Sequence, residues 1–146
     1  MNSKDKHNVK YKIETIETKM ALFRWYKKYS VNNTELDKHH KTLICIFNRL
    51  YDNCLGRKSS KCIEPIIVEL ICYSGYHFSS EERHMRNIGY KEIYKHILEH
   101  RAFTQRILEL KHVAEANDPG ATKDLIAFLG KWILNHIILE DKKFTT

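Results

Sequence analysis

The chain has 146 residues, of which 42% are hydrophobic and 29% are charged, and it contains only 5 glycines and 2 prolines. This length suits one domain with a core of its own, and the scarcity of glycine and proline argues against a loop-rich β protein or a disordered chain. The formal net charge is +7, but basic residues are interleaved with acidic ones and no basic–aromatic motif accompanies them, so we expect no nucleic-acid-binding surface.

A polar segment precedes the predicted helices. Residues 1–19 are polar and weakly patterned, which predicts an N-terminal extension, and residues 20–146 predict the folded domain. The extension lacks the apolar core of a signal peptide, and no apolar run in the chain reaches the ~18 residues of a membrane span. We therefore expect a cytoplasmic protein without a membrane partner. Its four cysteines lack zinc-site spacing and are expected to be reduced, with Cys45 on an apolar face.

Four segments with apolar residues at helical spacing follow. The first begins at Thr34, where Asp37 would complete a capping box, and stops near Gly56. The second starts after a pair of serines and ends in a turn around Gly89, and the third ends at the Asn-Asp-Pro-Gly break at 117–120. The fourth runs on an apolar stripe that includes Phe128 and Leu139. These patterns predict an all-α protein, an antiparallel up-down-up-down four-helix bundle with an N-terminal arm.

Histidines and one glutamate stand out on the inner faces of these helices. His77 and Glu81 are four residues apart, as are His96 and His100, so each pair lies on one helix face. At about 1.5 Å rise per residue, His77 and His100 lie roughly 12–14 Å from the turn that joins their helices. Glu81 and His96 lie roughly 6–8 Å from the same turn.

The first and last helices add one histidine each at matching depths. His100 and His136 both lie about 22 Å from the loop between the third and fourth helices, and His40 and His77 lie roughly 21 and 25 Å from the loop between the first and second. A single buried histidine is more often a hydrogen-bonded core residue than a ligand. Five of them with an inward carboxylate would leave many buried polar groups without partners, unless they hold a metal.

The composition of this cluster favours two metal ions. Five imidazoles and a carboxylate exceed the ligand number of one tetrahedral zinc, and no thiolate joins them. Imidazole with carboxylate suits iron, copper, nickel or zinc, and because a carboxylate can bridge two ions, a dinuclear iron centre fits the count best. Helical spacing from His136 favours Glu140 as a further ligand, since Asp141 would need the helix end to unwind.

The combined pattern resembles hemerythrin, and specifically the single-domain bacterial hemerythrins. The likeness covers residues 20–146 and rests on Trp25, LDKHHK at 36–41, HFSSEERHM at 77–85, HILEH at 96–100 and WILNHIILEDKKF at 132–144. It implies a non-haem diiron site with two iron ions, Fe2+ or Fe3+, joined by an oxo or hydroxo bridge. One iron would be held by His96, His100 and His136, and the other, with an open position, by His40 and His77. Glu81 and Asp141 would bridge them, which selects Asp141 over Glu140.

The resemblance also implies a function. It predicts reversible dioxygen binding for storage, delivery or sensing, by a protein that is not an enzyme, in a pocket lined by Phe78, Trp132, Ile133 and Ile137. Dioxygen is the partner expected, and no protein partner follows from the sequence. His39, where the family usually has a polar residue such as Gln, lies off the apolar stripe and is not expected to be a ligand.

The alternative is a diiron enzyme, an oxidase or peroxidase, or a nitric oxide binding protein. The pairs Glu81–His84 and Glu109–His112 have the ExxH spacing of carboxylate-rich diiron bundles. Glu109 and His112, however, would lie roughly 25–30 Å from the turn between the second and third helices, far from Glu81. A histidine-rich site also offers few carboxylates, so we expect oxygen binding.

Overall fold

The computed structural model describes residues 23–55 and 60–145, and the predicted extension at 1–19 lies outside these ranges. The described residues contain helices and no strand. The elements are the 3-10 helix η1 (Lys27–Tyr29), the α-helices α2 (Thr34–Leu55), α3 (Ser60–Asn87), α4 (Ile93–Glu115) and α5 (Pro119–Asn135), the π-helix η2 (His136–Glu140) and the 3-10 helix η3 (Asp141–Phe144).

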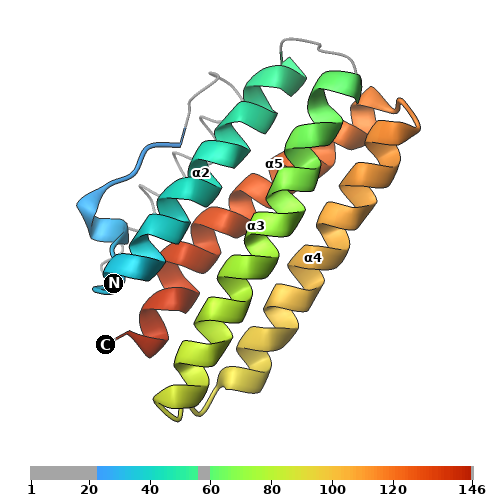
Figure 1. Cartoon of the computed structure of the whole chain (residues 1–146). Helices are drawn as coiled ribbons and strands as arrows, with labels where there is room; N and C mark the ends of the chain where they lie inside the picture. The colour runs from blue at the N-terminus through green and yellow to red at the C-terminus, as the bar shows by residue number, and fades with distance from the viewer. Residues whose placement is uncertain (1–22, 56–59, 146) are drawn as a thin grey trace, which may run out of the picture.

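The four α-helices lie side by side, and successive helices run in opposite directions (Figure 1). α2 packs on α3, α3 on α4, α4 on α5, and α5 on α2, so the helices form a closed ring of neighbours. The predicted antiparallel up-down-up-down four-helix bundle is therefore confirmed. Within the described ranges, no helix is both long enough and apolar enough to cross a membrane.

α2 begins at Thr34 as predicted, but its capping residue lies one position earlier. The cap is Asn33, whose side-chain oxygen accepts a hydrogen bond from the Leu36 amide at 3.1 Å. Asp37 does not close a capping box with Thr34. It instead accepts hydrogen bonds from the Ser30 hydroxyl at 2.6 Å and the Val31 amide at 2.9 Å. The carboxylate thus fixes the chain that leads into the helix.

The two later turns follow the predicted signals. Gly89 lies at φ +65, a conformation that L side chains rarely adopt, and reverses the chain between α3 and α4. Asp118 caps α5 by accepting a hydrogen bond from the Ala121 amide at 3.0 Å, and Pro119 occupies the first helical position, where a missing N–H costs nothing. These residues mark where the chain turns from α3 into α4 and where α5 begins.

The interior consists of two apolar clusters of unequal size. The larger one includes Leu43, Leu70, Phe103 and Ile133, one from each α-helix, and the smaller comprises Val31, Leu36, Met85 and Phe144. Along each helix the predicted ligands fall between a member of the small cluster and a member of the large one. The polar layer is therefore enclosed by apolar side chains on both sides.

Gly130 sets the distance between α5 and α2. A Cβ placed on it would lie 2.6 Å from Cζ of Phe47 and 3.2 Å from Phe23, whose rings stack at 5.1 Å. Any larger residue would force these buried rings apart. The glycine lets α5 approach α2 closely at a point about 9 Å along the helix from His136, on the side of the larger apolar cluster.

Three side chains lie further out than predicted. Phe128 and Leu139, expected on the inner stripe of the last helix, are 41% and 38% exposed, whereas Leu129, expected on the same stripe, is buried together with Ile126 and Ile133. Cys45 is exposed rather than packed on an apolar face, and none of the four cysteines is disulfide-bonded.

Candidate metal centre

Seven buried side chains from all four helices meet at one level of the bundle. α2 contributes one, α3 and α4 two each, and the end of α5 with its continuation two: His40; His77 and Glu81; His96 and His100; His136 and Asp141. The two carboxylates are completely buried, and none of the five histidines is more than 4% exposed. The structure thus brings together the seven residues that the family resemblance implied as metal ligands.

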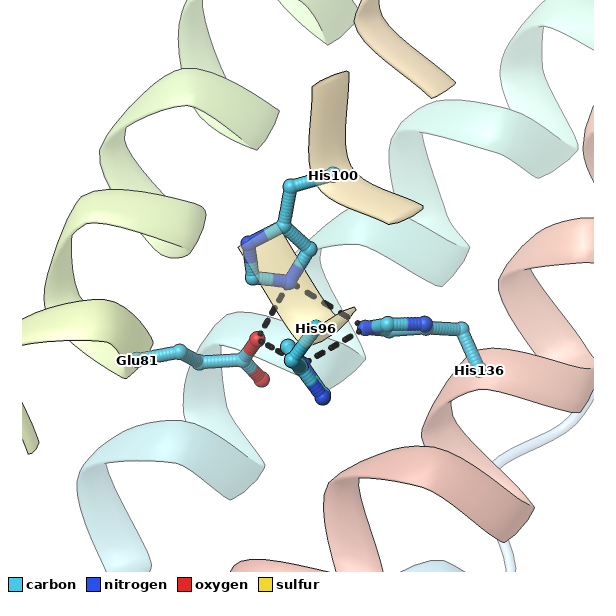
Figure 2. Close-up of side chains that lie close together, drawn as sticks. All are labelled: Glu81, His96, His100 and His136. Atoms are coloured by element: carbon cyan, nitrogen blue, oxygen red, sulfur yellow. Dashed lines mark hydrogen bonds and ion pairs between the residues drawn. The ribbon is translucent and has the colours of Figure 1, made fainter. Parts of the chain in front are cut away.

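One group consists of Glu81 with three histidines (Figure 2). The Nε2 atom of His136 lies 3.0 Å from that of His96 and 3.2 Å from that of His100. Glu81 directs Oε2 at the same point, 3.1 Å from His100 Nε2 and 3.6 Å from His96 Nε2. Three ring nitrogens and one oxygen therefore converge from three helices.

A second group shares Glu81 with the first and adds His40, His77 and Asp141. His77 Nε2 lies 2.8 Å from Glu81 Oε1, one helical turn away on α3. His40 Nε2 lies 3.2 Å from the same oxygen and 2.9 Å from Asp141 Oδ2. Here two ring nitrogens and two carboxylates converge, so one ligand position fewer is filled by histidine.

Each carboxylate faces both groups. Glu81 turns Oε1 toward His40 and His77, and Oε2 toward His100. Asp141 turns Oδ2 toward His40, and its Oδ1 lies 2.9 Å from His136 Nε2 and 3.2 Å from His96 Nε2. A carboxylate that presents one oxygen to each of two ligand groups can bridge two metal ions.

A π-helix turns Asp141 toward the site. Residues 136–140 form a π-turn, and the amide of Asp141 donates to the carbonyl of His136, five residues back. Five residues in an α-helix would rotate Asp141 about 140° away from His136, whereas a π-turn returns it to the same side. Glu140, which regular helical spacing favoured, instead pairs with Lys143 at 2.7 Å outside the cluster.

The buried oxygens and ring nitrogens of the cluster are arranged better for binding metal ions than for hydrogen bonding to one another. Glu81 Oε2 and both oxygens of Asp141 are buried without a properly directed hydrogen bond, although ring nitrogens lie close by. Three Nε2 atoms also face each other, and neutral imidazoles carry too few protons to satisfy all these contacts. A cation that accepts every lone pair would remove the cost of this arrangement.

The charges of the cluster are strongly coupled. Burial lowers the pKa of His136, but the charge and hydrogen bond of Asp141 outweigh it and raise the pKa to about 10. Burial likewise opposes ionisation of His40, yet hydrogen bonds to Asp141 and Glu81 raise its pKa to about 9. Burial also raises the pKa of Asp141, but the facing His136 and His40 bring it below its usual range. Protons on the imidazoles therefore occupy the positions that a metal would take.

A second layer of polar side chains contacts the outer nitrogens of the rings. Glu82 Oε1 lies 3.0 Å from Nδ1 of His100, and Glu99 Oε2 lies 3.2 Å from Nδ1 of His136. His39, predicted to point elsewhere, is buried with its Nδ1 3.2 Å from Nδ1 of His77. No pattern in the sequence indicated Glu82 and Glu99, apart from their positions next to predicted ligands.

Aromatic rings cover the group with three histidines. Phe78 stacks on His100 with ring centroids 3.8 Å apart, and Trp132 stacks on His136 at 4.2 Å. Ile133 and Ile137 are buried in the adjoining apolar cluster. Of the four predicted pocket residues, the two aromatic ones therefore lie directly on rings of this ligand group, and the two isoleucines belong to the apolar core.

The other polar residues considered as ligands stay outside. Glu109 pairs with Arg106 at 2.6 Å on the surface of α4, and His84 lies against Phe144 with ring centroids 5.9 Å apart. Neither they nor His112 belong to the two groups found among the described residues that could hold a metal ion.

Comparison with known proteins gives a consistent result. Residues 31–146 match the family model of the hemerythrin HHE cation-binding domain. A bacteriohemerythrin from Clostridium acetobutylicum is 30% identical over 129 residues, which cover 84% of this chain and 98% of the relative. A bacteriohemerythrin from Methylococcus capsulatus is 30% identical over 126 residues, covering 86% and 95%, and a hemerythrin-like protein from Naegleria gruberi is 30% identical over 122 residues, covering 84% and 90%.

A solved structure supports the same fold. The crystal structure of a leucine-to-phenylalanine mutant protein superposes with a TM-score of 0.75 at 29% sequence identity, and the match covers 85% of this chain and 95% of the other. The sequence thus matches these relatives, and the fold matches this solved structure, over most of the chain.

Proposed function

The chain belongs to the hemerythrin family, whose members hold non-haem iron, and from this we propose that it binds dioxygen reversibly at a centre of two iron ions. The observation that carries the proposal is the pair of overlapping ligand groups that share Glu81, with five imidazoles and two fully buried carboxylates. When iron is bound, it supplies the electrons and the coordination position that dioxygen needs.

In this proposal the ligand groups divide as their contacts suggest. His96, His100 and His136 would hold one iron, and His40 and His77 would hold the other. Glu81 and Asp141 would each contact both ions, which an oxo or hydroxo group would also join. Because the second group has one histidine fewer, its iron would keep a position open for dioxygen.

The protein's own apolar side chains make binding reversible. Phe78 and Trp132 cover two of the rings, and Ile133 and Ile137 fill the adjoining core. Such surroundings keep water and protons away from the reduced centre and so slow irreversible oxidation. We propose on this basis a binding protein rather than an enzyme.

The test combines iron content with the visible spectrum. The protein is reduced anaerobically, exposed to air and deoxygenated again, and we expect about two irons per chain and a colour that appears and disappears with oxygen. His77→Ala should lose the centre, whereas His84→Ala, a histidine on the same helix outside the site, should keep it. Two irons that oxidise once without releasing oxygen would favour an oxidase, a peroxidase or a nitric oxide binding protein, and a folded protein without iron would overturn the metal centre itself.

A further inference from the structure

The two ligand groups differ in the residues behind their histidine rings, that is, the residues that contact Nδ1, the ring nitrogen facing away from the cluster. In the group with three histidines, His100 and His136 each place Nδ1 against a carboxylate, Glu82 at 3.0 Å and Glu99 at 3.2 Å. In the other group, His77 places Nδ1 against a second imidazole, His39, at 3.2 Å. The Nδ1 of His40 is buried and has no hydrogen-bond partner among the described residues.

The outer nitrogen matters because it is coupled to the inner one. A ring whose Nε2 binds a metal carries its remaining proton on Nδ1, so the residue behind must accept that proton's hydrogen bond. A carboxylate acceptor draws the proton toward itself and makes the imidazole a stronger electron donor. A neutral acceptor fixes the orientation of the ring but adds much less to its donor strength.

The acceptors on the two sides carry different charges. Behind the three-histidine group the acceptors are carboxylates, which carry a full negative charge when ionised. Behind the other group the acceptor is an imidazole, which carries no negative charge in either protonation state. For His77 to donate, His39 must accept at Nδ1 and carry its own proton on Nε2.

Nearby cations weaken this asymmetry without abolishing it. Glu82 is 20% exposed and has the guanidinium of Arg86 at 3.6 Å, and Glu99 is 29% exposed with Lys95 near it. Both carboxylates nonetheless keep an oxygen close to the imidazole, Glu82 at 3.0 Å and Glu99 at 3.2 Å. Among the described residues, two carboxylates thus contact the outer ring nitrogens of one ligand group and none contacts those of the other.

We propose that Glu82 and Glu99 are positioning residues that tighten the hold of the three-histidine group on its iron, and that His39 leaves the iron at His40 and His77 more weakly held and the first to exchange. This inference rests on the proposed two-iron centre. It makes the iron with the free coordination position also the exchangeable one, and it assigns the difference to the second layer of residues.

The difference in ligand number alone would favour the same order of release, so the test changes only the residues behind the rings. Iron-loaded protein is mixed with an excess of a strong ferrous chelator, and the two phases of iron release are followed. Glu82→Gln and Glu99→Gln keep an oxygen acceptor but lose the charge, and each should speed the slow phase by about 10- to 100-fold. Glu140→Gln removes the same charge from a residue beside Glu99 without a ring contact, and should leave both phases unchanged.

His39 provides the converse variant. His39→Glu places a carboxylate behind His77 and should slow the fast phase, whereas His39→Gln, a neutral acceptor, should leave it near the wild-type rate. Should His39→Glu fail to fold, the two glutamine variants of the carboxylates still decide the outcome. A proton magnetic resonance spectrum of the iron protein adds a signature: the exchangeable ring proton of His136 should shift in Glu99→Gln and not in Glu140→Gln.

The outcomes separate this inference from the proposed function. A wild-type protein that binds fewer than two irons contradicts the proposed centre. A protein that binds two irons but releases them at wild-type rates in both Glu82→Gln and Glu99→Gln keeps that centre and overturns the inference. Equal acceleration of both phases would also overturn it, because the effect would then not be confined to the three-histidine group.

Discussion

Iron loading of the metal-free protein should release at least two protons per chain near pH 7.5. In the absence of metal, ion pairs with the two carboxylates keep His40 and His136 protonated, with pKa values of about 9 and about 10. Iron binds the neutral ring, so both protons must leave. Asp141 contributes none, because its pKa lies below the usual range and it is already ionised.

The magnitude follows from the proton count. Two protons displaced per loaded centre make the overall apparent binding constant rise about 100-fold for each pH unit from about 6.5 to 8, where both rings are charged in the metal-free protein. A water that ionises to form the bridge would add a third proton and a further tenfold per unit. Rings that were already neutral would contribute nothing to this slope.

The assay is an anaerobic titration with Fe2+, followed by calorimetry in two buffers with different enthalpies of ionisation. The heat difference gives the number of protons released, and competition with a chelator at several pH values gives the slope. Glu140→Gln serves as the control and should match the wild type. Release of one proton or fewer while two irons bind would refute the reasoning, since it would show that His40 and His136 are neutral before the metal arrives.

Three further predictions concern stability and the ligand at the chain's end. In urea unfolding, the metal-free protein should lose stability as the pH rises from about 7 to 10. The pKa values of His40 and His136 in the folded protein, about 9 and about 10, exceed the reference value of 6.5, so their contribution to stability is complete below pH 6.5 and is lost as the pH rises through the folded values. A stability that does not change over this pH range would contradict the ion pairs. Gly130→Ala should destabilise the fold by about 1–3 kcal/mol in thermal or urea unfolding, whereas Gly75→Ala, on an open helix face, should be neutral or stabilise it by up to about 1 kcal/mol. Asp141→Ala should lower the iron content far more than Glu140→Ala, and the reverse result would remove Asp141 from the site.

The periodic part of the molecule could be predicted from the sequence. Helices with one apolar stripe leave little choice but a bundle, and the rise per residue then fixes the depth of each histidine. The spacing alone therefore predicts that His40, His77, His100 and His136 lie at one level of the bundle. Their convergence depends on the lengths of the helices and the positions of the loops, and both can be predicted from the sequence.

The orientation of Asp141 could not be predicted from spacing alone. Whether a helix end continues as an α-turn or widens to a π-turn depends on what the residues beyond it pack against. Here the burial of Asp141 among imidazoles and of Phe144 in the small apolar cluster favours the wide turn. Only the family resemblance pointed to Asp141, and the structure supplies the physical reason.

The residues behind the rings were missed for a related reason. Contacts such as Glu99 with His136 join side chains of different helices, so they depend on the rotation of each helix about its own axis. A helical wheel locates the centre of the apolar face but not its edges, where Glu82, Glu99 and His39 lie. The same uncertainty at the edge placed Phe128 on the inner face, although it is 41% exposed.

The π-turn at residues 136–140 has a consequence for the number of residues that can separate the last histidine from the acidic ligand in related chains. An α-turn returns a side chain to the same face after about four residues and a π-turn after about five, so a chain with one residue fewer between His136 and the carboxylate could present it from an unbroken α-helix. Deletion of a single residue at this point is therefore compatible with an intact centre. A search for relatives that fixes the distance between the last histidine and the acidic residue would then reject chains whose sites are equivalent in space.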